Sequence, residues 1–249
     1  MGQEGAIFRM KVTHQLRRLL WKFGYDICRF DRTSHPLARR KSFLENYEID
    51  TVLDIGANSG QFAQELRQDI GYTGRIISFE PLRQVFKLLE AHAKGDQRWE
   101  TFNIAIGDVE EKREINVAGN SLSSSFLDIL PTHLNAAPDS KYIGKEVIDV
   151  RSLDSMFEQV CKDASNIYMK IDTQGFESKV LRGAATSLSR IGTIQMEMSL
   201  VPLYGTELLF DEMCILMREN GYTLIAIENG FSVPGTAQLL QIDGIFRRL

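Results

Sequence analysis

The sequence predicts an α/β protein with a mostly parallel, doubly wound sheet and an antiparallel hairpin at one edge. From residue 51 onward, short apolar segments alternate with amphipathic segments of helical period, which is typical of strands joined by helices. The chain then ends on two strand-like segments, 222–228 and 239–246, with no long helix between them. Because parallel neighbours need a crossover connection, usually a helix, this closing pair predicts the antiparallel hairpin.

Composition and cysteine usage exclude several other protein classes. The 249 residues are 43% hydrophobic and 25% charged, which is ordinary for a globular chain and unlike a disordered or collagen-like one. The cysteines Cys28, Cys161 and Cys214 form no CxxC pair, and the four histidines show no ligand spacing. We therefore expect a cytoplasmic protein with no disulfide framework, no transmembrane segment and no metal site built by the protein.

The charge is unevenly distributed along the chain. Residues 1–41 hold ten Lys or Arg against three acidic residues, a net charge of +7, whereas the remainder carries −11. This predicts a basic N-terminal helical arm over residues 1–45 and one catalytic domain over 46–249. Residues 7–23 repeat apolar positions at helical spacing among basic ones. Such a helix either makes a peripheral contact with an anionic membrane or a polyanionic substrate, or packs on its own domain; we favour packing.

Each element of the alternating region has a local signal. Apolar runs that end at Gly or Glu, 51–56 and 75–80, predict buried strands, and the amphipathic segment 83–93 predicts a helix. Further strands are expected at 99–106, 112–118, 147–150, 166–172 and 193–198, besides the two closing ones. Further helices are expected at 61–68, 153–161, 177–189 and 208–220. Residues 119–145 are rich in Ser, Pro and Gly without a period, and their length predicts a functional loop.

A glycine loop joins the first strand of this region to its first helix. Asp54, Gly56, Asn58 and Gly60 lie in it, where glycines allow close backbone approach and the following helix presents free N–H groups. Glu80 ends the next strand twenty residues later, where a carboxylate can accept both hydroxyls of a ribose. These residues predict a nucleoside-containing ligand at the switch point of the sheet. The alternative is an ordinary turn capped by Asn58 or Ser59.

The same loop favours one kind of nucleoside ligand. A dinucleotide site requires G-x-G-x-x-G so that the pyrophosphate can rest on the helix N-terminus, and Asn58 stands where the second Gly would be. The carboxylate of Asp54 would repel a pyrophosphate but suits a ligand with an ammonium group, such as S-adenosylmethionine. The pattern therefore speaks against a nicotinamide-dependent oxidoreductase.

Charged residues recur at the end of a later strand. Lys170 and Asp172 lie in the otherwise apolar segment 166–172. Because the strand ends of a doubly wound sheet face one cleft, we expect both side chains beside the nucleoside. Charged groups in a buried strand are costly unless they are paired. The alternative is therefore structural, with Lys170 paired to a neighbouring carboxylate and Asp172 capping the next turn.

Six segments, in this order and spacing, resemble one known family. They are VLDIGANSG (52–60), ISFEP (77–81), NIAIGD (103–108), MKIDTQGFESKVLRGA (169–184), MEMSLVPLY (196–204) and DGIFRR (243–248). Over four-fifths of its length the chain resembles the FkbM-type S-adenosylmethionine-dependent methyltransferases. The resemblance implies a Rossmann-like class I methyltransferase fold and methylation of a hydroxyl or similar group on a sugar, glycan or other natural product.

The resemblance also implies roles for the motif residues. Glu80 would hold the ribose, Ala105 and Asp108 would border the adenine, and Asp172 would lie near the transferred methyl group with Lys170 beside it. The residues of the methionine-side loop would be Asp54, Gly56, Asn58 and Gly60.

Methyl transfer to an alcohol gains from a general base. Asp172 is our first candidate, Glu197 at the end of the next strand is the second, and His133 in the 119–145 loop is the third. A magnesium ion between Asp172 and Glu197 remains an alternative. We expect the 119–145 loop to cover the acceptor side of the cleft.

Three functional hypotheses are thus consistent with the sequence. The first is a methyltransferase with a small-molecule or glycan acceptor and no nucleic-acid partner. The second is the oxidoreductase, and the third is a non-catalytic module that keeps a nucleoside pocket.

Overall fold

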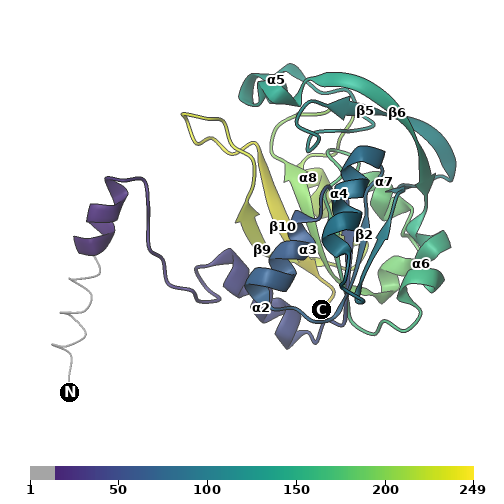
Figure 1. Cartoon of the computed structure of the whole chain (residues 1–249), viewed down its shortest axis with the longest axis horizontal. Coiled ribbons are helices and arrows are strands. Elements are labelled where there is room, and N and C mark those ends of the chain that lie inside the picture. The colour runs from purple at the N-terminus through teal and green to yellow at the C-terminus, as the bar shows by residue number, and fades with distance from the viewer. Residues whose placement is uncertain (1–14) are drawn as a thin grey trace. The chain divides into compact units, whose positions relative to one another are not determined.

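The computed structural model describes residues 15–249 and has two units, one that ends at Ser42 and one from Phe43 to Leu249 (Figure 1). In the first unit residues 15–21 are helical, within the helix predicted over 7–23, whereas 7–14 lie outside the described residues. Helix α2 (Pro36–Asn46) follows along the chain. No helix in the described range is long and apolar enough to cross a membrane.

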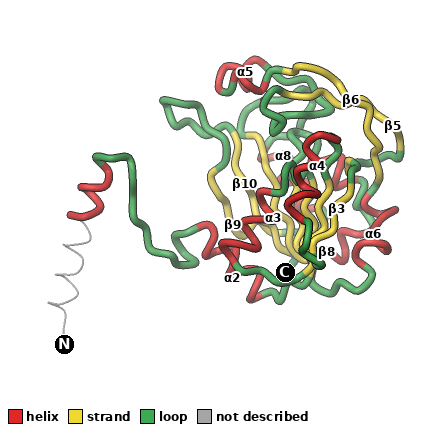
Figure 2. Tube along the Cα trace, viewed as in Figure 1, coloured by secondary structure: helices red, strands yellow, loops and turns green. Residues whose placement is uncertain are grey.

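The second unit is built on a seven-stranded sheet of order β3-β2-β1-β7-β8-β10-β9 (Figures 1 and 2). Its strands are β1 (Thr51–Ile55), β2 (Arg75–Phe79), β3 (Trp99–Phe102), β7 (Ile167–Ile171), β8 (Ile191–Ser199), β9 (Thr223–Asn229) and β10 (Gln241–Arg247). Strand β1 pairs in parallel with β2 and β7, and β7 pairs in parallel with β8. Strand β10 is antiparallel to both β8 and β9. The predicted doubly wound sheet with an antiparallel edge hairpin is confirmed.

Helices cover both faces of this sheet. Successive residues of a strand face opposite sides, so each face of the sheet forms its own apolar core with the helices that cover it. The helices are α3 (Gln61–Glu65), which a π-helical turn (Leu66–Ile70) extends, α4 (Arg83–Ala93), α6 (Leu153–Cys161), α7 (Glu177–Arg182) and α8 (Phe210–Glu219). Leu53 packs in the core formed with α6, α7 and α8. Its neighbour Val52 packs in the core formed with α3 and α4. Strand order reverses between β1 and β7, which places a ligand site at the carboxyl ends of these strands.

A second sheet, of order β4-β6-β5, was not predicted from the sequence. Its strands are β4 (Ala105–Ile106), β5 (Glu111–Ala118) and β6 (Tyr142–Arg151). The single strand predicted over 99–106 is wrong, because the chain turns between β3 and β4. At this turn the Asn103 side-chain amide donates to the backbone carbonyl oxygens of Glu80 and Pro81, at 2.9 and 2.8 Å. These bonds hold the two short strands in different sheets.

The loop predicted over 119–145 is more ordered than expected. It contains α5 (Pro131–Ala136) and a 3-10 turn (Pro138–Ser140), and β6 begins at Tyr142 and not at residue 147. The first half of β6 is mostly exposed, so no apolar run signals it, and antiparallel pairing with β5 determines its conformation.

The helix predicted over 177–189 is also wrong in its second half. Helix α7 ends at Arg182, and a separate 3-10 turn covers Ser187–Arg190. The Asp154 carboxylate accepts hydrogen bonds from the backbone N–H groups of Thr186 and Ser187, at 3.0 and 2.8 Å. A continuous helix would have used these two N–H groups for its own backbone bonds.

Candidate cofactor pocket and its carboxylates

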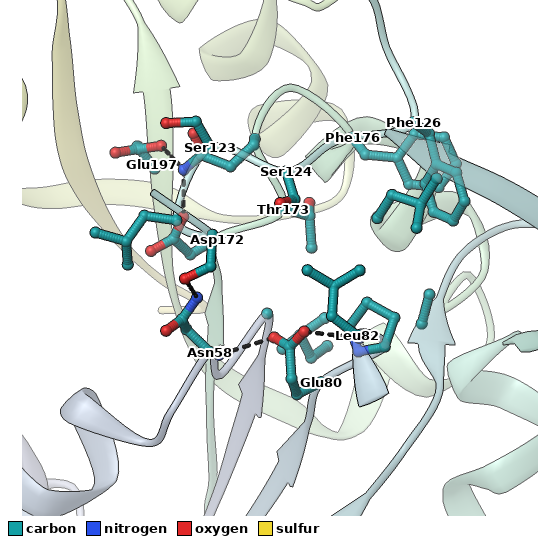
Figure 3. Close-up of a pocket in the computed structure, with 18 of the residues that line it drawn as sticks. Asn58, Glu80, Leu82, Ser123, Ser124, Phe126, Asp172, Thr173, Phe176 and Glu197 are labelled. Carbon is teal, nitrogen blue, oxygen red and sulfur yellow. Dashed lines mark hydrogen bonds between the residues drawn. The ribbon is translucent and has the colours of Figure 1, made fainter. Parts of the chain in front are cut away.

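A cavity of about 330 Å³ lies at the carboxyl ends of β1, β2, β7 and β8 (Figure 3). Residues from these strand ends line it, together with residues from the segment between β5 and β6, which we call the roof segment (residues 119–141). The volume lies at the lower end of the range found for small-molecule sites. The site therefore lies where the strand order predicts a ligand.

Gly56 and Asn58 give the loop after β1 its shape. Gly56 has a φ of +78°, and a Cβ there would overlap the backbone carbonyl oxygen of Asp172. Only glycine therefore lets the ends of β1 and β7 approach this closely. Asn58 has a φ of +48°, and its side-chain amide donates to Ser121 Oγ of the roof segment at 3.3 Å. Both residues line the cavity.

Gly60 serves packing at the start of α3. It has a φ of +89°, and a Cβ would lie 2.8 Å from the Trp99 ring and 2.9 Å from Leu89. It does not contribute to the cavity wall. Of the two glycines in this motif, Gly56 thus lines the cavity, whereas Gly60 packs outside the cavity wall.

Glu80 lines the cavity at the end of β2 and is 5% exposed. Its two carboxylate oxygens accept backbone N–H bonds from Asn58 and Leu82, both at 2.9 Å (Figure 3). Burial raises the pKa of Glu80 to about 7, although these two bonds oppose the shift. Each oxygen retains a free lone pair, so the carboxylate can accept further hydrogen bonds from a ligand.

An apolar slot lies beside Glu80. Phe126 of the roof segment and Phe176 form one side, with ring centroids 4.7 Å apart, and Figure 3 shows them facing Leu82. Ala105 and Ile106 of β4 also line this part of the cavity. A flat aromatic ligand group fits such surroundings.

Asp54 and Lys170 form a buried charged pair behind the cavity wall. Asp54 is fully buried, and Lys170 Nζ lies 3.8 Å from its Oδ1 and 3.1 Å from Oδ2 of Asp172. Burial raises the pKa of Asp54, and Lys170 and a hydrogen bond from Ser78 Oγ (3.3 Å) oppose the shift. Burial alone would lower the pKa of Lys170, but the two carboxylates raise it, so it stays charged.

Asp172 and Glu197 are bridged by an amide. Gln174 Nε2 donates to Asp172 Oδ1 and to Glu197 Oε2, both at 2.7 Å. Gln241 Nε2 donates to the same Glu197 oxygen at 2.9 Å. Burial, followed by the charges of Asp172 and Asp243, raises the pKa of Glu197 well above its usual value. The Gln174 NH₂ group thus links the two carboxyl groups that the magnesium alternative would have share an ion.

No group of three or more His, Cys, Asp or Glu side chains among residues 15–249 is arranged to hold a metal ion. His133 lines the cavity from the roof segment and is 3% exposed. Burial lowers the pKa of His133, so its ring is neutral at pH 7.

The structure brings most of the predicted site residues together at the cavity. Those that line it are Gly56, Asn58, Glu80, Ala105, His133, Asp172 and Glu197. Those that do not are Asp54, Gly60, Asp108 and Lys170. The Asp108 carboxylate instead lies 3.2 Å from Lys179 Nζ.

Sequence reasoning missed several polar residues of the cavity. Gln174 lies two residues after Asp172, inside the most specific motif, so its position was a usable signal. Gln241 carried no such signal, because its contacts arise only from tertiary pairing. The roof segment lies in the loop that we expected to cover the cleft, but of its polar residues only His133 was predicted as a site residue. The missed polar residues that line the cavity are Asn120, Ser121, Ser123, Ser124, Ser140, Thr173, Gln174 and Gln241.

Comparisons with known proteins agree with this geometry. The family model of the methyltransferase FkbM domain matches residues 54–224. Among curated protein sequences no match was found.

Solved structures of several proteins are similar over most of the chain. Precorrin-6y C5,15-methyltransferase from Geobacter metallireducens has 13% identity and a TM-score of 0.43 over 85% of this chain and 86% of its own. An uncharacterized Listeria monocytogenes protein has 7% identity and a TM-score of 0.47 over 87% and 68%. LepI in complex with SAM has 13% identity and a TM-score of 0.46 over 87% and 48%.

The family match begins at Asp54, ends in β9 and covers more than half of the chain, including every strand of the parallel part of the sheet except the start of β1. It also contains the loop after β1 and the three carboxyl side chains of the cavity, those of Glu80, Asp172 and Glu197. The chain therefore belongs to the FkbM-domain methyltransferase family and is an S-adenosylmethionine-dependent methyltransferase.

Proposed function

We propose that the protein methylates a hydroxyl oxygen of a small-molecule or glycan acceptor. The observation that carries this proposal is the carboxylate of Asp172, which lines the cavity and has a one-third exposed side chain. Lys170 Nζ at 3.1 Å and Gln174 Nε2 at 2.7 Å hold its two oxygens. An alcohol loses its proton as it attacks, and a positioned carboxylate can accept that proton. Glu197 is less suited, because its raised pKa favours the protonated form.

The cavity fits S-adenosylmethionine. Glu80 can accept hydrogen bonds from the ribose hydroxyls, and the apolar slot at Ala105, Phe126 and Phe176 suits the adenine ring. Gly56 would contact the methionine part. When bound, the cofactor supplies a methyl group on a positively charged sulfur, which is already activated for transfer.

The residues of this chain then have two tasks. They position the acceptor oxygen in line with the methyl group, which supplies a large part of the rate. Asp172 would take the hydroxyl proton as the acceptor oxygen attacks. The C–S bond of the cofactor would break as the C–O bond forms, and S-adenosylhomocysteine would leave with a neutral sulfur. Asp54 and Lys170 act indirectly, because Lys170 fixes one oxygen of Asp172.

Two measurements test the proposal. Calorimetry with S-adenosylmethionine, S-adenosylhomocysteine and NAD should show binding of the first two alone. Transfer of a ¹³C-labelled methyl group to hydroxyl acceptors should then give an O-methyl signal in the NMR spectrum. Binding of NAD in place of the methionine cofactors would support the oxidoreductase. Cofactor binding without transfer to any hydroxyl compound would support a non-catalytic module.

A further inference from the structure

The roof segment carries a buried polar cluster that the proposed reaction does not use. Asn120, Ser123, His133 and Ser140, which we call the roof cluster, all line the cavity. Ser140 Oγ lies 2.9 Å from Ser123 Oγ and 3.1 Å from His133 Nε2. The Asn120 amide donates to Ser140 Oγ at 3.0 Å and to Ser123 Oγ at 3.1 Å. Apolar residues would close a cavity wall at lower cost, so this polar network points to a ligand.

His133 retains an unused hydrogen-bonding atom. Its Nδ1 is buried and has no partner among the residues that the structure describes. The ring packs against Tyr204 and Phe231, with centroid distances of 5.1 and 5.2 Å, and Phe231 also lines the cavity. A neutral imidazole has one donor and one acceptor nitrogen, so it can bond a ligand hydroxyl in either direction.

The roof cluster lies at the carboxylate end of the cavity. Figure 3 shows Ser123 near Glu197 and Asp172, across from Phe126, Phe176 and Glu80. Tyr204 connects the two groups, since its ring packs edge-on against His133 and its hydroxyl donates to Gln174 Oε1 at 2.7 Å. Gln174 in turn bridges the two carboxylates. The roof cluster therefore faces the region left for the acceptor.

The cavity wall holds carboxyl groups but no cationic side chain among the described residues. No Lys or Arg is among the described residues that line it, whereas Glu80, Asp172 and Glu197 are. The Lys170 ammonium lies behind the wall and is paired with Asp54 and Asp172. A phosphate or carboxylate at this end would lie beside the Asp172 carboxylate and find no unpaired cation on the wall.

We infer that the roof cluster binds the methyl acceptor, and that it selects uncharged, hydroxyl-bearing acceptors against those that carry phosphate or carboxylate groups near the reacting oxygen. This inference rests on the proposed O-methylation. His133 and Ser140 contact acceptor hydroxyls next to the one that is methylated, and they determine specificity, while Asp172 takes the proton.

The first test uses matched pairs of acceptors with protein already shown by calorimetry to bind S-adenosylhomocysteine. The pairs are methyl hexopyranosides and their 6-phosphates, and trans-1,2-cyclohexanediol and its monophosphate. Labelled methyl transfer should occur to uncharged members only. Transfer to phosphorylated members alone would overturn the inference but leave O-methylation standing. No transfer to any member, charged or uncharged, would overturn both, and failure to bind S-adenosylhomocysteine would overturn the proposed function by itself.

The second test uses His133→Leu, His133→Gln and the control His35→Leu, which lies in the N-terminal unit. His133→Leu should raise KM for the best uncharged acceptor about tenfold, as expected for one lost buried hydrogen bond. KM for S-adenosylmethionine should stay unchanged. His133→Gln, which keeps a polar group, should recover most of the acceptor KM. A loss of kcat with an altered pH profile, or equal effects of Gln and Leu, would overturn the assignment.

Discussion

The Lys170 ammonium offsets the negative charge of the neighbouring carboxylates. A lysine in a buried strand is unfavourable unless paired, and here its ammonium lies 3.1 Å from Asp172 and 3.8 Å from Asp54. The first part of the structural alternative, that Lys170 pairs with a neighbouring carboxylate, is therefore confirmed. Its second part is not, because Glu177 and not Asp172 accepts from the backbone N–H groups of the next turn. The pairing of Lys170 does not compete with a role for Asp172, because the same pair holds that carboxylate at the cavity.

The pH dependence of cofactor binding should report on Glu80. Its pKa of about 7 means that the carboxyl group is increasingly protonated below pH 7, and a protonated group accepts ribose hydrogen bonds less well. We expect the affinity for S-adenosylhomocysteine, measured by calorimetry, to rise between pH 5 and 7 and then level off.

Glu80→Gln is the matched control for this dependence. It keeps the shape and one acceptor oxygen but cannot ionise, so binding should be weaker by about one to two orders of magnitude above pH 7 and insensitive to pH. Wild-type affinity that does not change with pH would remove the ionised Glu80 from the binding site.

Asp172→Asn should separate chemistry from binding. The substitution removes the proton acceptor while keeping an oxygen that can accept from Lys170 or Gln174. Turnover on the hydroxyl acceptor should fall by about 10²–10⁴, with affinity for S-adenosylhomocysteine nearly unchanged. A parallel loss of cofactor affinity would make Asp172 a binding residue and not a base.

At the scale of elements, some helices and strands could be predicted from local sequence patterns, whereas others form only through tertiary contacts. Helix α4 was predicted with the observed bounds, because a clear amphipathic pattern follows Pro81. β6 was predicted too short, because its first residues are polar and only pairing with β5 makes them a strand. The same distinction applies to the site. Charged residues at the ends of predicted strands were identified as site residues, whereas Gln241, which lies on an antiparallel strand, could not be identified from the sequence.

The approach of β1 to β7 should depend on Gly56. An alanine there would need a positive φ and would overlap the Asp172 carbonyl group. We expect Gly56→Ala to lower the free energy of unfolding by about 2–5 kcal/mol, measured by urea denaturation. Gly144→Ala is the control, since a Cβ there meets nothing within 4 Å, and it should change stability by less than about 0.5 kcal/mol. Equal effects would show that the approach tolerates a side chain.

The roof segment should be protected by ligands. Leu122 lines the cavity and is 56% exposed, so chymotrypsin can reach the bond after it. Cleavage there should slow when S-adenosylhomocysteine and an acceptor are both bound, because such segments become ordered over a ligand. Cleavage after Phe23 in the N-terminal unit is the internal control. If ligands leave the Leu122 rate unchanged, the segment is a passive surface connection.

At the scale of the whole molecule, topology explains why widely separated residues meet. Parallel strands on either side of β1 deliver Glu80 from β2, Asp172 from β7 and Glu197 from β8 to one edge of the sheet. The alternation of strands and helices was sufficient to predict this convergence. It was not sufficient to predict the second sheet, whose strands β5 and β6 hold the two ends of the roof segment.

The basic N-terminal arm should be dispensable for cofactor binding. All residues that line the cavity lie between Ile55 and Gln241, and none belongs to the unit that ends at Ser42. Removal of residues 1–34, upstream of α2, should therefore change the affinity for S-adenosylhomocysteine by less than about twofold in calorimetry. The arm carries most of the basic excess of the chain, so the same truncation should abolish any sedimentation with anionic phosphatidylserine vesicles. Full-length protein that does not sediment with these vesicles would leave packing as the role of the arm. Weakened cofactor binding by the truncated protein would instead show that the arm supports the site.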